Sequence, residues 1–79
     1  MPNPATNAIN IRCNITDSKT AQVIITDVMG GTIAAFDSKQ LVNGVNELSY
    51  PTANMSNGLY IVHIKSGAVN TSQKVMVNN

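Results

Sequence analysis

The sequence predicts an all-β domain, a small Ig-like antiparallel β-sandwich of about seven strands. Three observations support this fold class. Apolar and polar residues alternate in several short segments, which is the pattern of half-buried strands. Glycine, asparagine, serine and proline separate these segments at the spacing typical of a small sandwich. No segment shows the apolar repeat of an amphipathic helix.

The strongest strand pattern follows a polar corner at 54–57 and extends through Lys65. Side chains of a strand alternate between its two faces, so Tyr60, Val62 and Ile64 share one face. We expect this face to lie in the core, because it is apolar apart from one phenol hydroxyl. The opposite face begins apolar and becomes polar towards Lys65, as in a strand that is covered at one end.

Tyr60 follows Gly58, which can adopt the positive φ that a sharp turn requires. A tyrosine after such a turn has two interpretations. It can form a tyrosine corner, in which the ring is buried and the hydroxyl binds backbone a few residues upstream, here 54–57. It can also be an ordinary buried aromatic residue. Val62 lies where an antibody-type domain carries a cysteine, so a sandwich formed by this chain lacks that disulfide.

The remaining predicted strands come before and after this one in the sequence. The first, from Ile9 to Ile15, places its isoleucines and Cys13 on one apolar face. In the strand expected at 31–37, the small side chains of Ala34 and Ala35 indicate either tight packing or an edge position. Further strands are expected at 21–26, 31–37, 45–50 and 71–77, with Pro51 ending the strand before it.

Length and composition limit the possible functions. The chain has 79 residues, which is enough for one small domain, and Cys13 is its single cysteine, so it has neither a disulfide nor a cysteine metal framework. Charged residues make up 11% and the net charge is +1. Without a basic run and with few aromatic residues, nucleic-acid binding has little support. No apolar run approaches the roughly 20 residues that span a membrane.

The first residues indicate where such a domain would be used. Met1 and the following Pro2-Asn3-Pro4 lack the basic start and the apolar run of a signal peptide. The chain is therefore either cytoplasmic or a piece of a longer protein whose export signal lies elsewhere. We favour the second alternative.

Few side chains are candidates for chemistry. His63 lies on the outer face of its strand, so we interpret it as a solvated neighbour of Lys65 rather than a metal ligand. Cys13 has no basic neighbour on its face, which favours a core residue over a reactive thiol. Asp27 is expected to accept hydrogen bonds from the backbone of the Gly30–Gly31 turn, since no second carboxylate or base lies nearby. We therefore expect no enzyme, no cofactor and no metal site.

Five short motifs occur in a fixed order: Pro2-Asn3-Pro4-Ala5, Asp27-Val28-Met29-Gly30, Asn43-Gly44-Val45-Asn46, Gly58-Leu59-Tyr60-Ile61-Val62 and Lys74-Val75-Met76-Val77. Together they resemble the C-terminal sorting domain, type A, of type IX (Por) secretion cargo in Bacteroidota, over nearly the whole chain. Two departures are visible. Gly31 stands where an arginine is common, and Met55 replaces the leucine of the usual Leu-x-x-Gly, which conserves volume.

The resemblance implies a secretion and sorting signal without catalysis, at the C-terminus of a larger secreted protein, so that 1–79 is a single sorting domain. Its implied partners are the type IX outer-membrane translocon, a shuttle protein and a sortase-like surface peptidase that removes the domain. The implied location is secreted or at the cell surface, reached through the periplasm and outer membrane. Motif by motif, the resemblance assigns recognition to Gly58, Tyr60, Lys74 and Val77, and marks the start of the domain with Pro2, Asn3 and Pro4.

The last strand offers a partner its backbone groups if it lies at a sheet edge. Lys74 on that strand has two interpretations, since it either pairs with an acidic partner or protects the edge from aggregation. An open edge also predicts a strand-mediated homodimer. The alternative function is a stand-alone Ig-like adhesion or carbohydrate-binding module, for which Tyr50 is the one candidate aromatic platform.

Overall fold

The structure, a computed structural model, describes residues 7–79. The predicted Pro2-Asn3-Pro4 motif lies outside these residues. The described chain forms six strands and no helix, and therefore no helix long and apolar enough to cross a membrane. The strands are β1 (Ala8–Ile15), β2 (Gln22–Asp27), β3 (Thr32–Phe36), β4 (Gly44–Pro51), β5 (Gly58–Ser66) and β6 (Val69–Val77).

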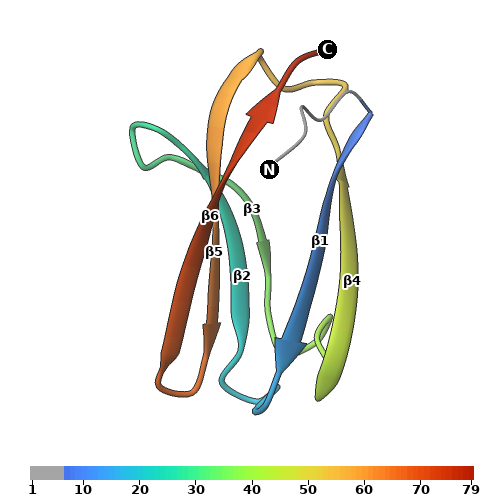
Figure 1. The fold of residues 1–79 in the computed structure, drawn as a ribbon, viewed down its shortest axis with the longest axis vertical. Helices are drawn as coiled ribbons and strands as arrows, with labels where there is room; N and C mark the ends of the chain where they lie inside the picture. Colours follow the sequence, from blue (N-terminus) through green and yellow to red (C-terminus); the bar gives the residue numbers. More distant parts are fainter. Residues whose placement is uncertain (1–6) are drawn as a thin grey trace.

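The strands form two antiparallel sheets that face each other, which confirms the predicted sandwich (Figure 1). The smaller sheet pairs β1 with β4, and the larger has the order β3-β2-β5-β6. The segments predicted at 21–26 and 31–37 differ from β2 and β3 by one residue at each end, and the strands predicted at 45–50 and 71–77 were too short. β4 includes Pro51, which pairs with Ala8 at the strand end, and β6 begins at Val69 rather than Thr71. A proline is tolerated at such an end because its missing N–H interrupts no central ladder.

The segment between β3 and β4 contains a buried side chain outside any strand. Leu41 is in the core, but the backbone beside it is satisfied by a side chain. The Asn46 amide accepts a hydrogen bond from Val42 N (2.9 Å) and donates one to Val42 O (2.8 Å). The segment around Leu41 is not a strand, and the described residues contain six strands, close to the seven expected.

The β2–β3 turn forms as the sequence predicts. Asp27 Oδ1 accepts hydrogen bonds from Met29 N (2.9 Å) and Gly31 N (2.8 Å), which confirms its expected role. Gly30 has a φ of 88°, which favours glycine, whereas Gly31 does not have a positive φ. A Cβ at Gly31 would lie 2.9 Å from Asp27 Oδ2, so a larger residue there would require the Asp27 carboxylate to shift.

The core lies between the two sheets and is richest along the central strands β2 and β5. Val23, Ile25 and Val62 are almost completely inaccessible to solvent there. β3 is an edge strand, which confirms the edge interpretation of its small alanines. Cys13 is partly buried against the core, and burial raises the pKa of its thiol. The remaining buried apolar residues are Ile9, Ile11, Ile15, Ala21, Leu41, Tyr60 and Val77.

Candidate functional site

The candidate site is the β5–β6 hairpin, which carries all four residues expected to act in recognition. Gly58 opens β5 with a φ of 150°, outside the range that other residues readily adopt. Two residues later the Tyr60 ring is 7% exposed, and its hydroxyl donates a 2.7 Å hydrogen bond to the carbonyl oxygen of Ser56. This geometry confirms the tyrosine corner and excludes the simpler interpretation of Tyr60 as a buried aromatic without a corner.

Strand pairing brings three of the four residues together at one end of the hairpin. Gly58 pairs with Val77, and Tyr60 pairs with Val75 on the next core-facing rung. Val77 is 1% exposed, so Tyr60 and Val77 are both core residues. A partner that binds the surface of the folded domain does not contact these buried side chains. They affect its binding only by keeping the hairpin folded.

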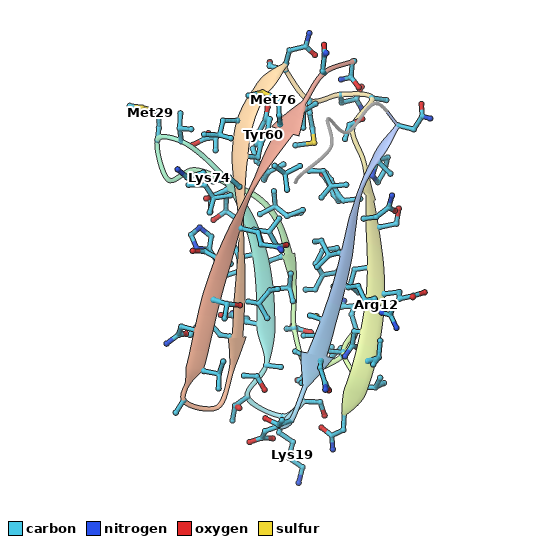
Figure 2. All side chains as sticks on the ribbon, in the orientation of Figure 1. Arg12, Lys19, Met29, Tyr60, Lys74 and Met76 are labelled. Atoms are coloured by element: carbon cyan, nitrogen blue, oxygen red, sulfur yellow. The ribbon has the colours of Figure 1, made fainter. Side chains whose placement is uncertain are left out.

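Lys74 differs from the other three because its side chain is exposed on the outer face of the larger sheet. It lies opposite Ile61 on β5 and points away from the smaller sheet (Figure 2). Within 7–79 the one ion pair is between Arg12 and Glu47, at 3.9 Å, and Lys74 does not contact a carboxylate. Its ammonium group is therefore available to a partner.

β6 is an edge strand, since among the described residues 7–79 β5 is its sole neighbour in the sheet. The hairpin has a two-residue loop at Gly67-Ala68, with Ser66 opposite Val69. Such a hairpin closes on a hydrogen-bonded pair, and hydrogen-bonded and non-hydrogen-bonded pairs then alternate along the strands. The backbone N–H and C=O groups that point to the open edge are those of Asn70, Ser72, Lys74 and Met76.

The segment after β6 is fastened to the polar corner, which the sequence patterns missed. The buried Thr52 hydroxyl donates to Asn79 Oδ1 (2.9 Å), and Asn79 Nδ2 donates to the carbonyl oxygens of Thr52 (2.8 Å) and Met55 (3.1 Å). The Asn79 backbone N–H donates to Asn57 Oδ1 at 2.8 Å. The edge is therefore open along β6 itself, while the residue beyond it is held by the corner.

No sequence signal identifies this Asn79 contact in advance. Thr52 and Asn79 are 27 residues apart, and neither belongs to an alternating pattern. The corner that they close is also the segment whose Ser56 carbonyl binds Tyr60. Tyr60 and Asn79 thus bind the same loop, and both support the start of β5.

The outer face of the larger sheet also contains a shallow depression of about 400 Å³. His63 Nε2 lies 3.0 Å from the Thr26 hydroxyl in this depression, so the predicted solvated neighbour of Lys65 is half-buried and hydrogen-bonded. Lys65 and Ser72 line the same depression. Among residues 7–79 no three His, Cys, Asp or Glu side chains are grouped so that they could hold a metal ion.

The hairpin with its tyrosine corner and exposed lysine can be compared with known families. A family model described as "secretion system C-terminal sorting domain" matches residues 1–78. The chain belongs to this family. No curated protein and no solved structure gives a significant match. As a sorting domain of type IX secretion, it is a signal for interaction with the secretion machinery, and its cargo is a secreted or surface-exported protein. Sorting domains of this family are not enzymes.

Proposed function

We propose that this sorting domain is the C-terminal part of a larger secreted protein and directs that cargo through the outer-membrane translocon to the cell surface. The translocon and a shuttle protein recognise the folded domain, and a sortase-like peptidase removes it at the surface. The open edge of β6, next to the buried Tyr60 and Val77, is the observation that carries this proposal. An exposed edge offers backbone donors and acceptors to a strand of the machinery.

The four recognition residues then divide into two classes. Gly58, Tyr60 and Val77 keep the hairpin in its folded geometry, because they form the corner and the core beneath it. Lys74 is exposed and acts by direct contact with a partner. Substitutions in the first class reduce sorting in proportion to the loss of folded domain. A substitution of Lys74 reduces sorting while the domain remains folded.

The basic test is removal of residues 74–79 from a full-length cargo, which we expect to leave the cargo in the periplasm. This deletion also removes Val77 and Asn79, so a sharper pair of variants is needed. Ser72→Pro removes an N–H that points to the open edge, whereas Gln73→Pro removes one that pairs with Val62 inside the sheet.

Both proline variants are compared with the natural domain in the same cargo. We expect Ser72→Pro to retain the cooperative unfolding of the domain and to lose surface display, measured by protease accessibility on intact cells. Gln73→Pro is expected to lose both folding and display. Normal surface display of the Ser72→Pro cargo would show that the β6 edge is not the recognition element.

The alternative of a carbohydrate-binding module has no observation in its favour. Tyr50, its one candidate platform, pairs with the buried Ile9 and packs half-buried against the core. An aromatic platform for a sugar needs a broadly exposed ring face, whereas Tyr50 is half-buried and lines a depression with Asp27 and Tyr60. The open β6 edge also fits the expected homodimer, because two copies can pair their edge strands antiparallel.

A further inference from the structure

The outer face of the larger sheet carries the exposed apolar side chain of Met76 near the end of β6. Met76 lies opposite Leu59 in the strand pairing and is 46% exposed. Val28 and Met29, in the β2–β3 turn, are 61% and 90% exposed and line a depression with Asp27, and Met29 lies at the same end of the molecule as Met76 (Figure 2). Methionine side chains adapt their shape to a partner, so this end of the sheet is suited to an apolar contact.

The charge of this face is unbalanced. Lys74 and Lys65 project from it, and the one carboxylate in the four strands, Asp27, lies on the opposite side, where it lines a depression with Tyr50 and Tyr60. The smaller sheet is different, because on its outer face Arg12 stands directly opposite Glu47 and the charges cancel. A cationic face without its own carboxylates complements an acidic partner.

The backbone of β6 fixes where such a partner would place its side chains. A strand added to the open edge has its side chains directly opposite those of β6, with Cβ atoms about 5 Å apart. On the outer face, positions two residues apart on the added strand therefore meet Lys74 and Met76. One of these neighbours is a cation and the other is apolar.

We propose that the β6 edge binds an extended acidic segment in which a carboxylate and an apolar residue, two positions apart, face Lys74 and Met76. The proposal rests on the function given above and names the chemistry of the partner at the same edge. The backbone hydrogen bonds supply affinity, and the side chains of Lys74 and Met76 select the sequence of the bound segment. This assigns Lys74 to recognition of an acidic partner rather than to protection of the edge alone.

The test uses the full chain and two synthetic peptides as long as β6, which has 9 residues. Both peptides have threonine at every second position. At the positions between the threonines, glutamate and valine alternate in the first peptide, and lysine and valine alternate in the second. Binding is measured by titration with NMR detection of the domain's backbone amides. We expect the glutamate peptide to bind about three- to tenfold more tightly than the lysine peptide. Its largest amide shifts are expected along β6.

Two charge-reversal variants of the domain localise the effect. Lys74→Glu is expected to invert the preference between the peptides. Lys65→Glu is the matched control, because it makes the same charge change on the same face but one strand away from the edge, and it should leave the preference unchanged. Equal binding of the two peptides, or equal effects of the two variants, would overturn the proposal. Binding to phosphatidylserine vesicles with no binding of either peptide would also overturn it, in favour of a lipid surface.

The outcomes separate this proposal from the proposed function. If Ser72→Pro abolishes surface display while both peptides bind alike, the edge is the recognition element and the acidic partner is refuted. If Ser72→Pro leaves display unchanged, edge recognition itself fails, whatever the peptides do.

Discussion

Removal of one oxygen atom from Tyr60 tests whether the corner stabilises the hairpin. Tyr60→Phe keeps the ring, which is 7% exposed, and removes the hydroxyl that donates to Ser56 O at 2.7 Å. A hydrogen bond of this kind contributes about 0.5–1.5 kcal/mol to the free energy of unfolding. Ser56 is exposed, so water can hydrate the carbonyl once the hydroxyl is gone. We therefore expect a loss of about 1 kcal/mol, without the larger penalty of a buried unsatisfied acceptor.

The measurement is urea denaturation of the full chain, followed by circular dichroism. With a slope of about 1 kcal/mol per molar urea, as found for small proteins, the midpoint falls by about 1 M. In thermal unfolding the same loss lowers Tm by about 4–8 °C. The slope itself should not change, because the surface exposed on unfolding is nearly the same.

Tyr50→Phe is the matched control for this prediction. It removes the same atom from the other tyrosine, whose hydroxyl makes no hydrogen bond to the residues that the structure describes. Its unfolding free energy should change by less than about 0.5 kcal/mol. Equal midpoints for the two variants would refute the argument that the corner hydrogen bond, rather than ring burial alone, stabilises the start of β5.

Three further changes have expected outcomes. Asn79→Ala leaves the fully buried Thr52 hydroxyl without its acceptor and should cost about 1–3 kcal/mol in urea unfolding, while Asn78→Ala, at an exposed position, should cost little. Val77→Ala opens a cavity at a 1% exposed position and should cost about 2–3 kcal/mol, read from the same midpoint. Burial raises the pKa of the Cys13 thiol, so the folded state holds its proton more tightly and stability should fall as pH rises above about 8.5, a decline that Cys13→Ala removes in unfolding measured against pH.

The features that the sequence predicts are those with a local physical signature. Alternation along β5 places Val62 in the core because the strand period is two residues. The Asp27 turn follows from a short polar side chain beside glycine, and the Tyr60 corner is one of the two interpretations that an aromatic residue soon after Gly58 allows. In each case, residues close in sequence determine the contact.

The features that the sequence does not predict depend on residues that only the fold brings together. Asn46 belongs to a predicted strand by pattern, yet its buried amide also bonds the backbone of Val42, four residues earlier. Asn79 closes on Thr52 through side-chain hydrogen bonds, which have no period along the chain. The exposure of Met76 beside Lys74 likewise follows from the order of the strands, because β6 has no neighbour on its open side.

A residue of this sorting domain can affect surface display in two ways, by stabilising the fold or by contacting the partner. Tyr60, Val77 and Asn79 act on the folded fraction, and each 1.4 kcal/mol lost increases the unfolded fraction about tenfold. A domain of this size has roughly 4–12 kcal/mol of stability, so one such loss still leaves most molecules folded. Surface display of these three variants should therefore follow a single curve against the free energy of unfolding. Lys74→Glu alters an exposed side chain, and its display should fall well below that curve because the partner, and not the fold, detects the change.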